Sequence, residues 1–155
     1  MKIQVKLNAI LEEMELAFEE SCSLLNTKTG EIVLLTLDDL RAAENEEPFD
    51  DLPDWQQENR MIAMDVVENF EDYIELPTKY DVNEYDIMEN FCFTVRDQRK
   101  QDRLLRTIKG KGAFRRFKDN IIDLGIEDQW YSYRTECFKE IAIEWCRENN
   151  IECID

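Results

Sequence analysis

The chain of 155 residues contains no histidine. Its absence removes Ser-His and Cys-His nucleophile pairs, imidazole acid–base catalysis near neutral pH, and the commonest ligand of transition metals. Carboxylates, Lys, Tyr or Cys would have to carry any catalysis. The composition therefore lowers the expectation of an enzyme, and we assign no catalytic residue, no metal and no cofactor.

Linkers and long apolar segments are also missing. No Gly/Ser-rich stretch and no internal repeat divides the chain, and 155 residues is close to the commonest size of one domain. The longest strongly apolar run, Ile32 to Leu35, is far too short to cross a bilayer. The N-terminal segment mixes Lys and Glu into its apolar pattern, unlike a signal peptide. We expect a single globular domain over residues 1–155, no membrane association and a cytoplasmic location.

The five cysteines are odd in number and contain no Cys-x-x-Cys pair, so neither a disulfide framework nor a zinc knuckle is indicated. Cys137 and Cys146 are nine residues apart on one predicted helix. A rise of about 1.5 Å per residue separates them by roughly 13 Å, too far to form a bridge. We interpret the cysteines as small apolar residues in or near the core and not as reactive nucleophiles.

Positive charge is concentrated in one segment of an acidic protein. The chain carries 19 Lys and Arg against 36 Asp and Glu, a formal net charge of −17. Residues 96–118, here called the basic band, carry a net charge of +8, which leaves −25 for the other 132 residues. Such segregation governs how a molecule meets its partners and says nothing about reaction chemistry. The ten cations of the band are Arg96, Arg99, Lys100, Arg103, Arg106, Lys109, Lys111, Arg115, Arg116 and Lys118.

Hydrophobic periodicity predicts a helix-rich α+β fold with a small antiparallel sheet, made of a β-hairpin and one further strand. The expected strands are 22–25, 31–36 and 72–76, with 151–154 as a tail or edge strand, and Asn26 and Gly30 provide the hairpin turn. Between the strands 31–36 and 72–76 we expect an acidic flexible loop near 45–54. The expected helices cover 3–18, 38–44, 53 or 54 to 70, 83–95, the basic segment up to 108, 114–124 and 128–149.

The turn Gly110-Lys111-Gly112 joins the basic helix to the start of the next one. Exposed N–H groups at a helix start, with nearby cations, can hold a phosphate or an acidic peptide. The spacing is not that of a Walker loop. The candidate anion- or partner-binding residues are Gly110, Lys111, Gly112, Arg115, Arg116 and Lys118.

A plainer interpretation of the same segment stays open. Gly110 would end one helix, Gly112 would let two helices approach, and Phe114 and Phe117 would belong to the core. The cations would then pair with the protein's own surplus carboxylates.

The sequence gives less support to two further types of site. The surrounding acidic residues repel a phosphate backbone and so argue against nucleic-acid binding through the basic band, although charges are screened over about 8 Å and a local patch could still bind. Carboxylate groups such as Asp119 with Asp123, or Asp50, Asp51 and Asp54, match no EF-hand pattern, and we interpret them as solvated surface. Trp130, Tyr131 and Trp145 are interpreted as packing anchors.

The segment from Gly110 to Asp119, followed by Trp130-Tyr131 and Trp145, resembles the signature of a bacterial family catalogued as uncharacterised protein family 0158. The hairpin from Leu24 to Ile32 and the strand from Tyr73 to Pro77 resemble that family as well. Asn26 departs from the pattern, because the family often carries Asp there. The resemblance implies a single-domain cytoplasmic bacterial protein and brings no activity, substrate or cofactor.

We therefore predict a non-catalytic interaction or regulatory module that uses the basic band to dock an acidic or phosphorylated partner. The alternative is an enzyme acting on a phosphorylated small molecule held at the turn 110–112. A local nucleic-acid contact through the same band is a second alternative. The sequence leaves the oligomeric state open.

Overall fold

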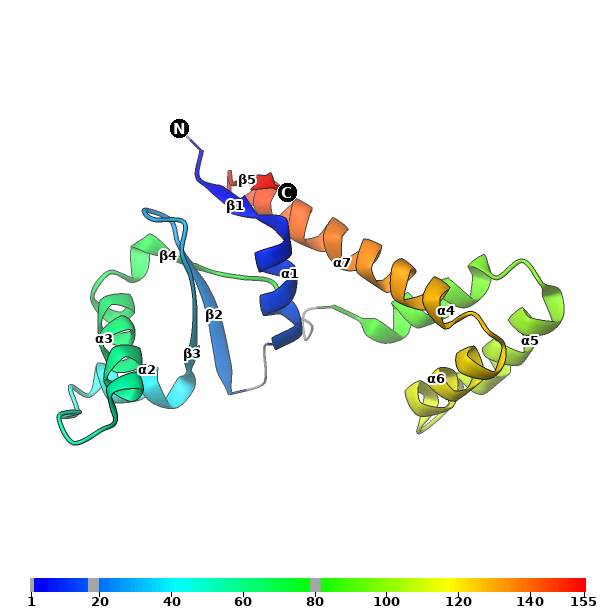
Figure 1. Cartoon of the computed structure of the whole chain (residues 1–155), viewed down its shortest axis with the longest axis horizontal. Coiled ribbons are helices and arrows are strands. Elements are labelled where there is room, and N and C mark those ends of the chain that lie inside the picture. The colour runs from blue at the N-terminus through cyan, green and yellow to red at the C-terminus, as the bar shows by residue number, and fades with distance from the viewer. Residues whose placement is uncertain (1, 17–19, 79–81) are drawn as a thin grey trace. The chain divides into compact units, whose positions relative to one another are not determined.

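The computed structural model describes residues 2–16, 20–78 and 82–155. Over these residues the helix-rich α+β fold is confirmed, with a three-stranded antiparallel sheet and a separate parallel strand pair (Figure 1). The elements in chain order are β1 (Gln4–Lys6), α1 (Leu7–Leu16), β2 (Ser21–Asn26), β3 (Ile32–Thr36), α2 (Leu37–Glu44), α3 (Asp54–Glu68), the 3-10 helix η1 (Phe70–Asp72), β4 (Tyr73–Glu75), α4 (Glu84–Thr94), α5 (Gln98–Thr107), α6 (Ala113–Asp123), α7 (Glu127–Glu148) and β5 (Glu152–Ile154).

The chain divides into two compact units. Unit 1 comprises Met1–Lys79 and Ala142–Asp155, and unit 2 comprises Tyr80–Ile141. Helix α7 belongs to unit 2 up to Ile141 and to unit 1 from Ala142 onward. The expectation of one domain over residues 1–155 stays a prediction.

The predicted hairpin forms as β2 and β3 of the sheet in unit 1, where the strand order β3-β2-β4 makes β2 the central strand. Leu24 of β2 pairs with Val33 of β3 and with Glu75 of β4. Its turn forms as the sequence predicts. The Asn26 side chain accepts hydrogen bonds from the backbone N–H groups of Lys28 (2.9 Å) and Thr29 (3.3 Å), and Gly30 has a φ of 81°.

Alternation along β2 directs side chains to both faces of this sheet. On one face Leu24 and Leu35 form a core with Ala43 of α2 and with Ala63 and Val66 of α3. On the other face the hydroxyl of buried Ser23 donates to Glu13 of α1 at 3.3 Å. Figure 1 accordingly shows α2 and α3 on one side of the sheet and α1 on the other.

Side-chain caps fix the starts of several predicted helices. Thr36 accepts from the N–H of Asp39 at the start of α2, and Asn83 accepts from Asp86 at the start of α4, each at 3.1 Å. Such caps satisfy backbone N–H groups that have no partner within the helix. The predicted starts of these helices are therefore close to the observed ones.

The prediction of a helix from residue 3 is wrong for its first turn. Gln4 and Lys6 are exposed and Val5 is 4% exposed, which is the alternation of a strand. The strand β1 pairs in parallel with β5, with Val5 opposite Cys153, so 151–154 does include an edge strand. The predicted end of that helix, at residues 17 and 18, lies outside the described residues.

The acidic segment 45–54 has no helix or strand before α3 begins at Asp54, as predicted. The Gln57 side-chain amide donates to the backbone carbonyls of Asp50 (3.2 Å) and Leu52 (2.8 Å). The flexibility of the segment 45–54 stays a prediction. Trp55 in the first turn of α3 and Phe70 just after its end are 62% and 69% exposed.

Four aromatic side chains form the centre of unit 2. The ring of Phe117 lies 4.8 Å from Trp130 and 6.1 Å from Phe91, in edge-to-face geometry, and Tyr133 lies 5.5 Å from Phe91. Trp130 is thus a packing anchor, as expected. Phe114 is not a core residue, because it is 37% exposed and Ala113 occupies the buried position.

Candidate functional site

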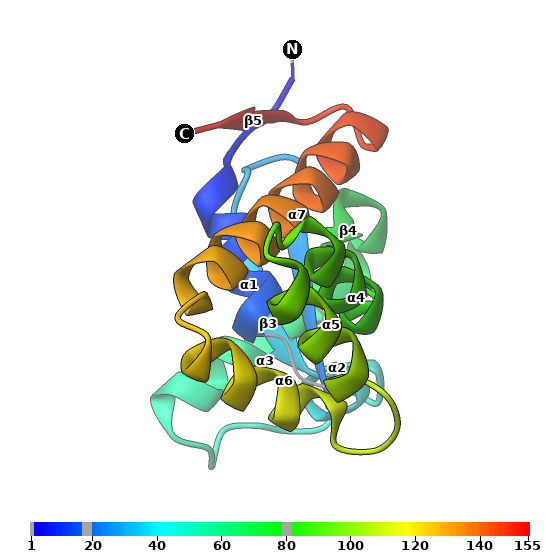
Figure 2. The ribbon, with the colours of Figure 1, turned by 90° about the vertical axis from the view of Figure 1, so that its right-hand side faces the viewer.

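The basic band forms a helical hairpin within unit 2, in which α5 and α6 pack against each other (Figure 2). The buried residues Leu104 and Ile108 on the α5 side, and Phe117 and Ile121 on α6, are each at most 1% exposed. Between the helices Gly110 and Gly112 have φ values of 82° and 78°, which favour glycine. All six candidate residues therefore lie in the turn or in the first half of α6.

Arg116 is held inside the turn. Its Nε donates to the carbonyl of Thr107 (3.0 Å), Nη2 to that of Lys109 (2.6 Å) and Nη1 to that of Lys111 (2.5 Å). A Cβ at Gly112 would lie 3.1 Å from Nη1. The Arg116 side chain is exposed, but among the described residues its guanidinium pairs with no carboxylate and instead satisfies carbonyls at the end of α5 and in the turn.

Two further cations join α5 to the end of α6. Lys100 Nζ donates to the carbonyl of Leu124 at 3.3 Å. Arg103 Nε donates to Asn120 at 2.6 Å, and its Nη2 lies 3.4 Å from a carboxylate oxygen of Asp123. These cations hold the hairpin together, and Asp123 serves as a partner of Arg103.

The other seven cations of the band are exposed and have no ion-pair partner in the part of the chain that the structure describes. The plainer interpretation, in which the band is neutralised by the protein's own carboxylates, is therefore wrong for most of it. These seven, here called the open cations, are Arg96, Arg99, Arg106, Lys109, Lys111, Arg115 and Lys118.

The two units differ sharply in charge. Unit 2 contains twelve Lys and Arg and twelve Asp and Glu, so its formal net charge is zero. Unit 1 contains seven Lys and Arg and 24 Asp and Glu, so it carries the whole net charge of −17. The open cations thus belong to a neutral unit and not to the acidic one.

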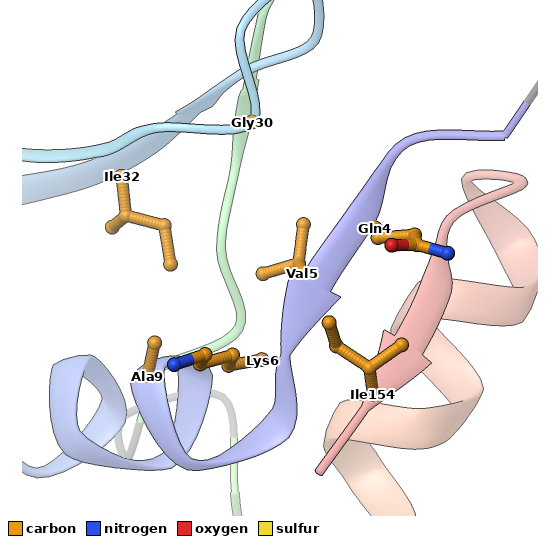
Figure 3. A pocket seen from close by; sticks show the side chains of 7 residues that line it. All are labelled: Gln4, Val5, Lys6, Ala9, Gly30, Ile32 and Ile154. Carbon is orange, nitrogen blue, oxygen red and sulfur yellow. The ribbon is translucent and has the colours of Figure 1, made fainter.

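Two cavities of unit 1 are lined by residues outside the basic band. The first cavity, of about 360 Å³, lies where β1, β5 and α1 meet the β2–β3 hairpin. Val5, Ile32 and Ile154 converge on it (Figure 3). The second, of about 310 Å³, lies beside the acidic segment and is lined by Glu46, Phe49 and Arg60 among others.

Within the described residues, no group of three or more Cys, Asp or Glu side chains could hold a metal ion. No described helix is long and apolar enough to cross a membrane.

Burial, followed by the charge of Glu75, raises the pKa of the Cys22 thiol to about 11, and burial raises the pKa of Cys92 to about 11. Both thiols are protonated at neutral pH, which agrees with a packing role.

A scan against family models matches the chain to the uncharacterised protein family UPF0158 over residues 3–155. A search of curated proteins and a search of solved structures each return no match.

Proposed function

Because the chain belongs to the UPF0158 family, whose function is uncharacterised, we propose from the site alone that it is a non-catalytic interaction or regulatory module of the cytoplasm. The basic band docks an acidic or phosphorylated partner protein. The acidic unit 1 keeps the molecule dispersed and discourages nonspecific binding to nucleic acid.

The open cations carry the proposal. A surface ion pair contributes only about 0 to 1 kcal/mol of stability, and within the described residues nine of the ten cations in the band have none. Lys100 and Arg116 bind backbone carbonyls, and the seven open cations remain exposed. Arg115 and Lys118 are three residues apart on α6 and share a face, and Lys111 stands in the preceding turn. Together they present exposed donors for carboxylates or phosphates.

Arg116 has a different part in this proposal. Its donors are used on the carbonyls of the turn, so it shapes the surface that carries Lys111 and Arg115. Contact with the partner falls to Lys111, Arg115 and Lys118.

The alternative, an enzyme that binds a phosphorylated small molecule at 110–112, has one observation in its favour. Gly112 offers no side-chain cap, so the first N–H groups of α6 remain available to an anion. It is the weaker proposal, because Arg116 is engaged elsewhere. A thermal-shift assay with inorganic phosphate and a nucleoside triphosphate tests it, since ligand at about 100 times its dissociation constant adds roughly 2.7 kcal/mol of stability.

The docking proposal is tested by fluorescence anisotropy with a phosphoserine-containing acidic peptide, its unphosphorylated form and a short DNA duplex as probes. The variant is Arg115→Glu/Lys118→Glu. We expect it to bind the acidic peptides at least about tenfold more weakly than the wild type, equivalent to about 1.4 kcal/mol. Raising the salt concentration weakens wild-type binding, because exposed charges are screened.

The matched control is Lys2→Glu/Lys6→Glu, which makes the same change in net charge at exposed positions outside the band. It retains peptide binding if the effect is local. Equal losses in both variants, or none in the first, contradict the proposal. Preferential binding of the DNA duplex favours the nucleic-acid alternative instead.

A further inference from the structure

The sheet of unit 1 ends in two edge strands, β3 and β4, because its strand order is β3-β2-β4. The edge of β4 is met by a side chain. Trp145, near the end of α7, donates its indole N–H to the backbone carbonyl of Glu75 in β4 at 2.9 Å. Covering an edge in this way is one of the means by which proteins keep an edge strand from pairing with another chain.

The edge of β3 has no such cover among the described residues. The N–H of Asn26 donates to the carbonyl of Glu31 at 2.8 Å, which fixes the residues of β3 that bond to β2. Bonded and non-bonded pairs alternate in an antiparallel ladder, so Ile32 and Leu34 direct their N–H and C=O groups away from β2. Within residues 2–16, 20–78 and 82–155, no hydrogen bond reaches these groups.

The side chains of the same two residues add an apolar surface to this edge. Leu34 is 36% exposed, and Ile32 lines the cavity of about 360 Å³ together with Val5 and Ile154 (Figure 3). Strand β3 also contains no charged residue and no proline, which natural edge strands use to prevent pairing. The edge therefore combines available backbone groups with an apolar cavity beside it.

We propose that the edge of β3 is a docking site for an extended segment of a partner protein, which adds to the sheet as a further strand. The backbone of the segment bonds to Ile32 and Leu34, and one of its apolar side chains enters the cavity beside Ile32. Side chains at every second residue of a strand point to the same face, so the segment carries apolar residues at alternate positions.

Charge favours such a partner over a second copy of this chain. Unit 1 carries a net charge of −17, and pairing of two β3 edges would bring two such units together against their mutual repulsion. A segment with Lys or Arg between its apolar residues is attracted instead. By alternation these basic residues share a face with exposed Glu31, while Lys6 lines the cavity and disfavours a cation there.

The direct test is fluorescence anisotropy with the labelled peptide Lys-Val-Lys-Val-Lys-Val-Lys as the probe. A peptide of the same composition with its valines placed together has the same charge but lacks the alternation. We expect the wild-type protein to bind the alternating peptide at least about tenfold more tightly, equivalent to about 1.4 kcal/mol. Equal binding of the two peptides indicates attraction by charge alone and overturns the proposal.

N-methylation of the alternating peptide tests backbone pairing, because it removes N–H donors and leaves the charge unchanged. Successive N–H groups of a strand point to opposite sides, so only one set faces β3. This is the valine set if the segment runs antiparallel to β3, and the lysine set if it runs parallel. We expect methylation of one set to weaken binding by at least about tenfold and methylation of the other to have little effect. Equal losses, or none, contradict strand addition.

A matched pair of protein variants locates the site. Leu34→Lys places a charge on the edge of β3 and should weaken binding of the alternating peptide by at least about tenfold. Met61→Lys makes the same change on α3, where Met61 is 62% exposed, and should retain binding. Equal weakening in both variants overturns the proposal. Sedimentation that finds a wild-type dimer, dissociated by Leu34→Lys, would assign the edge to a second copy and overturns it as well.

Discussion

Arg116 shows how a residue chosen for its charge can have a structural role. Its guanidinium donates to three carbonyls around the turn that follows α5. We expect Arg116→Ala to lower the free energy of unfolding of unit 2 by about 1 kcal/mol, because hydrogen bonds at an exposed site contribute modestly. Arg115→Ala, with no such contacts, should change it by less than about 0.5 kcal/mol. Urea unfolding of both variants measures the difference, and equal effects contradict this role.

Cys92 is a residue whose burial should be visible as a pH dependence. Burial raises its pKa from the ordinary 9.0 to about 11. Below pH 9 both states keep the proton, and between pH 9 and 11 the unfolded state alone loses it. The contribution to stability is therefore complete below pH 9 and is lost as the pH rises through 11, an effect on the order of 2 kcal/mol.

Cys92→Ala removes this titration. Its free energy of unfolding should lie below that of the wild type at pH 8, and the gap should narrow as the pH rises from about 9 to about 11. Denaturant titrations over this range provide the measurement. A gap that stays constant would show that Cys92 does not titrate as its burial requires.

At the residue scale, the sequence predicted which side of a helix is buried but not which groups each side chain contacts. It placed Phe117 and Trp130 in the core correctly, because their spacing follows the helical period. It failed for Phe114, where the neighbouring Ala113 takes the buried position, and it did not indicate that Arg116 would bind carbonyls. A charge run in a sequence does not reveal whether each side chain turns outward or back onto the chain.

At the scale of elements, the sequence predicts structure that depends on neighbouring residues and misses structure that depends on distant ones. The helices from α2 to α7 follow from periodicity and from caps such as Asn83, which all lie within a few residues of the helix. Strand β1 depends on β5, almost 150 residues later in the chain. Because a pairing of that kind leaves no trace in local spacing, Ile3 to Lys6 was assigned to the helix that follows.

Helix α5 is the element on which a cap should matter most. Leu104 is the one residue within its bounds that is buried, so packing holds it weakly. Asp97 accepts hydrogen bonds from the N–H groups of Arg99 (3.0 Å) and Lys100 (3.2 Å). We expect Asp97→Ala to cost about 1 kcal/mol and to reduce hydrogen-exchange protection in α5, whereas Asp97→Asn retains most of it. Equal protection in the two variants would contradict a capping role.

At the scale of the whole molecule, the two units differ in net charge, and this difference is not visible in the linear sequence. The basic band stands out in the sequence, where the rest of the chain looks like one acidic body. Unit 2 contains the band and enough carboxylates to bring its net charge to zero. The acid that remains belongs to unit 1, and a division of this kind follows from tertiary contacts that composition does not reveal.

This charge distribution predicts that the two units respond differently to salt. In unit 1, 24 acidic residues face seven basic ones, so self-repulsion opposes its compact state. Raising the sodium chloride concentration from about 20 mM to about 500 mM shortens the screening length from roughly 20 Å to below 5 Å and should relieve that repulsion. Hydrogen-exchange protection of β2, β3 and α3 is therefore expected to rise with salt.

Unit 2 serves as the control in the same sample. Its net charge is zero, so protection of α4 and of the α6 residues around Phe117 should change little, while binding of acidic peptide by the open cations falls over the same range. A parallel rise in both units would point to a general salt effect on apolar burial. Salt that protects unit 1 while weakening the docking surface of unit 2 would show that the two charge patterns act independently.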